Sequence, residues 1–273
     1  MQAASRESYK VAAERLDAYA RGAEPSAVAS TADDILSAAT LLRREPRLRR
    51  ALSDPARSAE DRAGLLTGIL GGKVGADALD LLTGLVSGRW SAPSELLDGT
   101  ERLGVEALLA SADKAGDLGE VEDELFRFGQ VVSGQSALSN ALSDPIAPAE
   151  RRATLARDLL AGQARPVTVR LVEAALGGFG GRSFSGALTR LVELAADRRD
   201  RQVAYVTVAA PLSDEEERRL GARLSEMYGR EVSVKQTVDP EVLGGVSVRV
   251  GSDLYDGTVL RRLNETRNAL AKR

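Results

Sequence analysis

The stretch EVSVKQTV, DPEVLG and GVSVRVG, residues 231–251, decides how the last third of this chain folds. Its two outer parts alternate apolar and polar residues, as strands with one buried face do. In the connector, Pro240 cannot donate a backbone hydrogen bond, and Gly244 and Gly245 allow backbone angles closed to other residues. We therefore expect a two-stranded hairpin joined by a shaped turn of Asp239, Pro240, Gly244 and Gly245.

A further strand and two helices are expected around this unit. Residues 202–208 are rich in β-branched and aromatic side chains, which favours a strand. The segment SDEE at 213–216 is a capping box that opens a helix, and Gly229 is placed to end it. A last helix is expected after Thr258. The order strand, helix, strand, strand, helix predicts a small α+β domain.

Three segments of this region match a known family in the same order. They are VTVAAPLSDEEERRL at 206–220, VDPEVLGGVSVRVGSDLYDGT at 238–258 and the closing helix. Together they resemble the C-terminal domain of the delta subunit of rotary, proton-driven ATP synthases, the oligomycin-sensitivity-conferring protein of mitochondria. The resemblance covers residues 202–273 and implies a non-catalytic subunit of such a synthase.

The first two thirds of the chain contain an internal repeat. ALSDPARSAEDRAGLLTGILGG at 51–72 recurs as ALSDPIAPAERRATLARDLLAG at 141–162, with an offset of 90 residues. This period is longer than those of the common solenoid repeats, so duplication of a whole helical bundle is the better interpretation. The family's usual plan has a single bundle, and the extra copy leaves open which bundle contacts which partner.

Apolar residues spaced three and four apart, with Gly and Pro between the segments, place the helices. They are expected over 9–20, 28–42, 48–52, 58–71, 76–87 and 93–112, and then over 118–132, 137–142, 149–160, 166–176 and 184–196. The predicted fold is therefore mainly α with a C-terminal α+β domain. Its expected domains are helical bundles at 1–112 and 94–200, which share the helix 94–112, and the α+β domain at 201–273.

The composition argues against several classes of function. The 273 residues contain no cysteine and no histidine, which removes thiolate nucleophiles and the commonest general base and metal ligand. A net charge of −3 gives no reason to expect nucleic acid. No apolar run approaches the roughly 20 residues of a membrane span, so membrane contact is expected only through partners. We expect no cofactor, no metal and no catalytic residue.

Candidate catalytic motifs are weak. The pair Gly72-Lys73 lacks the earlier glycine and the following hydroxyl of a phosphate-binding loop. Asp239, Asp253 and Asp256 could supply a magnesium site or an acid and base pair, but Asp beside Pro or Gly is ordinary turn chemistry. A hydrolase that uses carboxylates alone is therefore disfavoured.

The resemblance implies two contacts with partner subunits. In the family, an N-terminal helix of an alpha subunit lies in the groove between the first and fifth helices of the bundle, and the C-terminal domain binds the b subunits. Six apolar residues among positions 78–86 agree with such a face, although they could equally close their own core. The expected alpha-binding residues are Tyr9, Ala13, Leu16, Ala20, Leu79, Leu82 and Val86. The candidate b-binding residues are Val242, Leu243, Leu260 and Leu263, although closing the core of their own domain is the more common role of such residues.

The function expected from the resemblance is mechanical. As a peripheral-stalk, or stator, subunit, the chain would link the catalytic head through the b subunits to the membrane-embedded proton channel and resist rotor torque. The expected partners are alpha subunits, with beta subunits as a further candidate, and b subunits, with one copy per complex. The expected location is the cytoplasmic side of the cell membrane. The alternative is a cytoplasmic helical adaptor unrelated to ATP synthase.

One basic cluster has no place in this scheme. It consists of Arg43, Arg44, Arg47, Arg49 and Arg50. Such a cluster could contact lipid headgroups or an acidic partner, but most charge runs are solvated surfaces, and that is the interpretation we favour.

Overall fold

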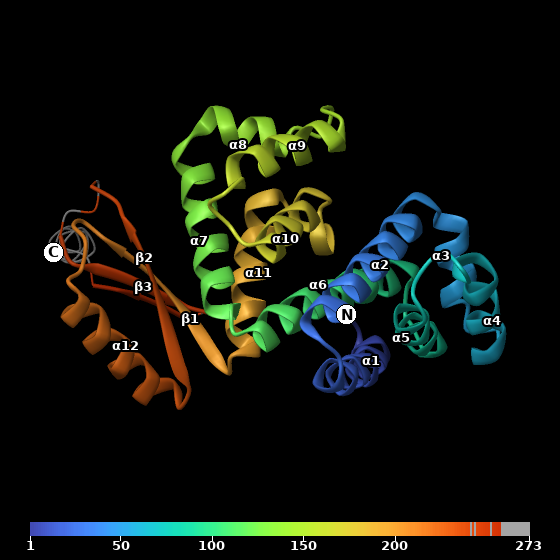
Figure 1. The fold of residues 1–273 in the computed structure, drawn as a ribbon. Coiled ribbons are helices and arrows are strands. Elements are labelled where there is room, and N and C mark those ends of the chain that lie inside the picture. Colours follow the sequence, from blue (N-terminus) through green and yellow to red (C-terminus); the bar gives the residue numbers. More distant parts are fainter. Residues whose placement is uncertain (241, 243, 252, 258–273) are drawn as a thin grey trace, which may run out of the picture. The chain divides into compact units, whose positions relative to one another are not determined.

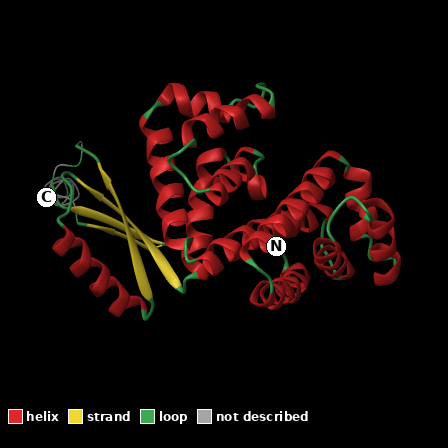
Figure 2. Ribbon diagram, in the orientation of Figure 1, coloured by secondary structure: helices red, strands yellow, loops and turns green. Residues whose placement is uncertain are grey.

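The computed structural model describes residues 1–240, 242, 244–251 and 253–257. The chain divides into two compact units, Met1–Leu191 and Val192–Arg273. Helices make up the first unit, and the strands all belong to the second (Figure 2). The predicted fold class, mainly α with a C-terminal α+β region, is confirmed. The predicted domain boundaries at residues 112 and 200 stay predictions.

Six helices form what we call bundle one (Figure 1). Proline begins α2, α3 and α6, at the position where the missing N–H would have no helical partner. The hydroxyl of Ser58 accepts a hydrogen bond from the Asp61 N–H at 3.0 Å and so caps α4. The helices are α1 (Ala3–Gly22), α2 (Pro25–Arg44), α3 (Pro46–Ser53), α4 (Ala59–Leu70), α5 (Ala76–Ser87) and α6 (Pro93–Ala115).

The helices repeat at the predicted offset. Helices α8 and α9 begin and end 90 residues after α3 and α4, and α6 begins 90 residues after α1. Helix α6 is therefore the last helix of bundle one and the first helix of bundle two, which we define as α6 to α11. The further helices are α7 (Leu118–Gly134), α8 (Ser136–Ser143), α9 (Ala149–Leu160), α10 (Pro166–Leu176), the 3-10 turn η1 (Phe179–Gly181) and α11 (Phe184–Arg198).

Equivalent polar contacts recur in both bundles at this offset. The carboxylate of Asp34 accepts a hydrogen bond from the Gly75 N–H at 2.7 Å, at the start of α5. The carboxylate of Glu124 accepts one from the Arg165 N–H at 2.9 Å, at the start of α10. A negative charge at a helix N-terminus offsets its unpaired N–H groups. The two bundles thus use the same device to fix their fifth helix.

Close packing in bundle one depends on two glycines of α6. A Cβ at Gly99 would collide with the ring of Trp90, and a Cβ at Gly104 would collide with the side chain of Leu36 on α2. The indole of Trp90 is buried and donates a hydrogen bond to the Leu85 carbonyl at 3.0 Å. Helix α6 can therefore lie very close to α2 and to the end of α5.

The second unit contains a four-stranded mixed sheet with the order β2-β1-β3-β4. Strand β2 runs parallel to β1, with Thr207 opposite Thr237, and β3 runs antiparallel to β1, with Val206 opposite Val248. Ser213 and Glu216 form the predicted capping box at the start of α12, and Gly229 ends that helix in the left-handed conformation. The elements are β1 (Arg201–Val208), α12 (Asp214–Tyr228), β2 (Glu231–Val238), β3 (Val246–Val250) and β4 (Asp253–Asp256).

The predicted hairpin of the last third is wrong. Strand β1 lies between β2 and β3, so the two valine-rich strands are not paired with each other. The crossover through α12 returns the chain parallel to β1 and places β2 on one side of it, which leaves the other side for β3. Strand β4, which pairs with β3, was not predicted. The predicted final helix, with leucines at 260, 263 and 270, lies outside the described residues.

Candidate partner-binding surfaces

Helices α1 and α5 pack against each other and form a partly exposed surface, which we call the α1–α5 seam. The Arg15 guanidinium lies 3.1 Å from the Asp80 carboxylate, and the two side chains are 45% and 67% exposed. At one end of the seam, the Ser8 hydroxyl bonds to the backbone of Arg89 at 2.8 Å. Val11 lies on the same face of α1, one turn from Ser8 and Arg15, and is 50% exposed. An exposed apolar side chain between two polar contacts can serve as an anchor for a partner helix.

Most of the predicted alpha-binding residues face the core of bundle one. Tyr9, Leu16, Ala20, Leu82 and Val86 are between 1% and 6% exposed, because the stripe at spacings of three and four is the stripe that packs inside the bundle. Ala13 and Leu79 are partly exposed and can be reached from outside. The binding role of all seven stays a prediction. Val11 was not among the predicted residues; it is an exposed apolar side chain on the polar face of α1.

Tyr9 is held inside the bundle by its neighbours on α6. The guanidinium of Arg102 lies 4.5 Å from the centre of the Tyr9 ring, a cation–π geometry. Burial raises the pKa of Tyr9 well above its usual value, and the negative charge of Glu106 raises it further. Tyr9 therefore stays neutral and packs within bundle one.

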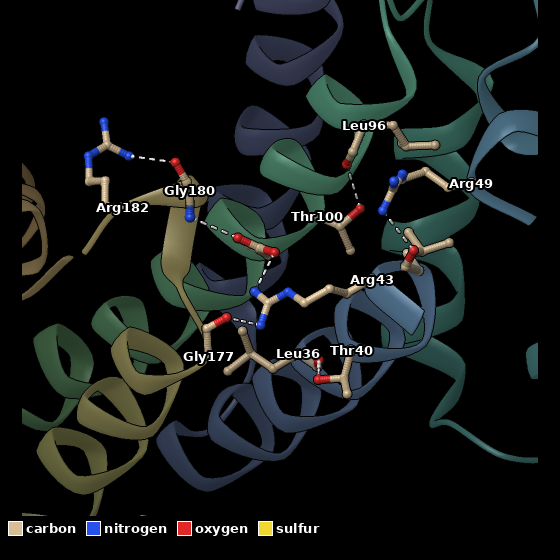
Figure 3. A network of polar contacts seen from close by, with 11 residues as sticks. Leu36, Thr40, Arg43, Arg49, Leu96, Thr100, Gly177, Gly180 and Arg182 are labelled. Atoms are coloured by element: carbon tan, nitrogen blue, oxygen red, sulfur yellow. Dashed lines mark hydrogen bonds and ion pairs between the residues drawn. The ribbon is translucent and has the colours of Figure 1, made fainter. Parts of the chain in front are cut away.

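The second bundle contains the equivalent surface, which we call the α6–α10 seam. At the 90-residue offset, Val11, Arg15, Asp80 and Gly84 correspond to Glu101, Val105, Arg170 and Ala174. Here a third helix, α2, joins the two. The Arg43 guanidinium of α2 lies 2.6 Å from Glu101 and also donates to the Gly177 carbonyl, while the Gly180 N–H donates to Glu101 at 2.9 Å (Figure 3). On the same side, Arg170 of α10 lies 3.0 Å from Asp33 of α2.

A cavity of about 280 Å³ remains between α2, α6 and α10. Burial raises the pKa of Asp33 at its edge, although the positive charge of Arg170 opposes that shift. The buried carboxylate of Glu101 has a charged donor and a backbone donor, which offsets its loss of water. The lining residues are Asp33, Leu36, Ser37, Ala39, Thr40, Arg43, Glu101, Arg170, Glu173, Ala174, Gly177 and Phe179.

We predicted that the whole basic cluster would be solvated, but two of its five arginines make contacts inside the protein. Arg43 is tied to Glu101, and Arg49 donates to the Leu42 carbonyl at 3.1 Å. Arg44, Arg47 and Arg50 are exposed and fit the solvated interpretation. Sequence offered no sign of the Arg43 contact, because Glu101 lies 58 residues away.

In the second unit, the connector between β2 and β3 has the unusual backbone that its glycines suggested. Gly244 and Gly245 have φ of 73° and 85°, and the Asp239 N–H donates to the Val208 carbonyl at 2.8 Å. Val242 is partly exposed. The other predicted b-binding residues, Leu243, Leu260 and Leu263, lie outside the described residues, so this surface stays a prediction.

Among the described residues, no three His, Cys, Asp or Glu side chains gather as a metal ion would require. No helix within the same part of the chain combines the length and the apolar character needed to cross a bilayer.

Comparison with known proteins gives a consistent result. A family model described as "ATP synthase delta (OSCP) subunit" matches residues 105–270, which include most of bundle two and the β-sheet unit. A protein named "ATP synthase subunit delta" from Salinispora arenicola is 86% identical over 274 residues and covers all of both chains. A protein of the same name from Streptomyces griseus is 46% identical, over 99% of this chain and all of the relative.

Proposed function

Because this chain belongs to the family of ATP synthase delta (OSCP) subunits, we propose that it is the stator joint of such a synthase, peripheral to the membrane on its cytoplasmic side. In this proposal, the helical bundles hold the catalytic head and the β-sheet unit holds the b subunits, so that the head cannot turn with the rotor. The observation that carries the proposal is the match of the whole chain, with both bundles included, to relatives named as delta subunits.

The structure suits a joint that must resist torque. Charged side chains tie α1 to α5 and α2 to α6 and α10, and buried leucines fill the space between the helices. A slipping joint would dissipate torque, so wide interfaces and slow dissociation are needed. We expect ATP chemistry to belong to the alpha and beta subunits.

The alpha contact is proposed at the α1–α5 seam. Val11, Ala13 and Leu79 are the apolar side chains there that a partner helix can reach, and such a helix would present apolar residues at spacings of three and four. The b contact is proposed at Val242, Leu243, Leu260 and Leu263, with one chain per complex.

The proposal is tested with the full chain and its synthase. The chain should co-purify with alpha, beta and b subunits, and adding it to head-depleted membranes with free heads should restore coupled proton pumping. Leu79→Arg should weaken this reconstitution at least about tenfold, whereas Leu159→Arg, at an exposed leucine of α9, should not. A chain that neither travels with the synthase nor restores coupling would refute the stator role and favour the adaptor alternative.

A further inference from the structure

The two seams differ in what lies over them. In the α1–α5 seam, Val11 is 50% exposed and Asp80 pairs with Arg15 of its own seam. At the equivalent positions of the α6–α10 seam, Glu101 is 4% exposed and Arg170 pairs with Asp33 of α2. The same position is therefore open in bundle one and covered in bundle two.

The cover is helix α2. Along α6 it is so close that Leu36 leaves no room for a side chain at Gly104, whereas the equivalent residue of α1 is the exposed Glu14. Along α10, helix α2 is held by the ion pair of Asp33 with Arg170. At the end of α10, Arg43 of α2 donates a hydrogen bond to the Gly177 carbonyl (Figure 3). Helix α2 therefore contacts both walls of the α6–α10 seam.

Side chains of α2 cross the α6–α10 seam: Arg43 meets Glu101 of α6, and Asp33 meets Arg170 of α10. The cavity between α2, α6 and α10 measures about 280 Å³. A partner helix could enter the α6–α10 seam only if α2 left it, and that would expose the buried carboxylate of Glu101 without its guanidinium partner.

We infer that α2 occupies, within the same chain, the position on bundle two that a partner helix would take on bundle one. The chain thus has one docking seam for an alpha-subunit helix, at α1–α5, although the family model matches bundle two. The duplication thus supplies a second bundle whose seam is closed by a helix of the first. This inference rests on the proposed function for the identity of the incoming helix, but not for the seating of α2.

Binding stoichiometry tests the number of seams. A peptide that copies the N-terminal helix of the alpha subunit is titrated into the full chain by calorimetry, and one peptide per chain is expected. Leu79→Arg should weaken binding at least about tenfold, and Val169→Arg, the equivalent and also partly exposed position on α10, should change it less than about twofold. Two peptides per chain, or equal effects of the two variants, would overturn the inference.

Cross-linking tests the seating of α2 without any partner. The chain contains no cysteine, so Asp33→Cys with Arg170→Cys gives one defined pair. A short bismaleimide should join the two within one chain in high yield, and each single-cysteine variant serves as the control. A yield no higher than in these controls would overturn the inference. If the pair does cross-link but no peptide binds the unaltered chain, the proposed alpha contact fails and the seating of α2 stands.

Discussion

Arg62 and Arg152 occupy the same place in the repeated sequence and should differ in their contribution to stability. Arg62 is 6% exposed and donates five hydrogen bonds to backbone carbonyls, three of them at the end of α5 on Val86, Ser87 and Gly88. The C-terminal end of a helix carries unpaired carbonyls and a partial negative charge. A cation there donates hydrogen bonds to the carbonyls and is attracted by the charge. Arg152 makes only two such bonds, both at 3.3 Å.

These contacts set the expected size of the effect. A hydrogen bond that involves a charged group is worth about 1.5–3 kcal/mol, but bonds to one side chain are not additive, and water enters when the side chain is removed. We expect Arg62→Ala to lower the free energy of unfolding by about 3–5 kcal/mol and Arg152→Ala by about 1–2 kcal/mol. Arg62→Lys should fall between them, because an ammonium cannot reproduce the planar fork of donors.

The assay uses the single tryptophan of the chain. Trp90 is buried next to the end of α5, so its fluorescence reports whether Arg62 still holds that end. Urea unfolding is followed by this fluorescence and by circular dichroism for each variant. Equal losses for the two alanine variants, or a loss below about 1 kcal/mol for Arg62→Ala, would refute the reasoning.

Three further predictions follow from single sites. Gly244→Val and Gly245→Val should each cost about 1–2 kcal/mol, because φ is 73° and 85° there; an unchanged melting temperature of the sheet would contradict this. The Ser5 hydroxyl lowers the pKa of Glu95, so this carboxylate stabilises the fold above its unfolded pKa and the contribution is lost as pH falls through the folded pKa. Ser5→Ala should raise that pKa and start the acid loss at higher pH; an NMR titration of Glu95 that does not move would argue against it. Leu82→Arg should unfold bundle one and not merely detach a partner, since Leu82 is 1% exposed; a native urea midpoint would disprove this.

Helix positions could be predicted well because their causes are local. The predicted bounds of α5, α9 and α10 agree with the structure to the residue, since Gly, Pro and the spacing of leucines and valines mark each end within a few positions. The capping box of α12 and its terminal Gly229 were also predicted correctly, because their residue patterns are local. The candidate site could be predicted less firmly, because the stripe that includes Leu16 and Leu82 packs inside bundle one, and its binding role stays a prediction.

Residue patterns were enough to predict the described helices, the duplication at 90 residues, the strand segments other than β4 and the resemblance to the delta family. Three features become visible only in the folded chain: β2 pairs with β1, Arg43 reaches Glu101, and α2 covers the α6–α10 seam. The difference comes from the separation along the chain over which each interaction acts. Helix propensity, capping and turn geometry act over a few residues, whereas strand pairing and ion pairs between helices depend on which surfaces remain free after the chain has packed.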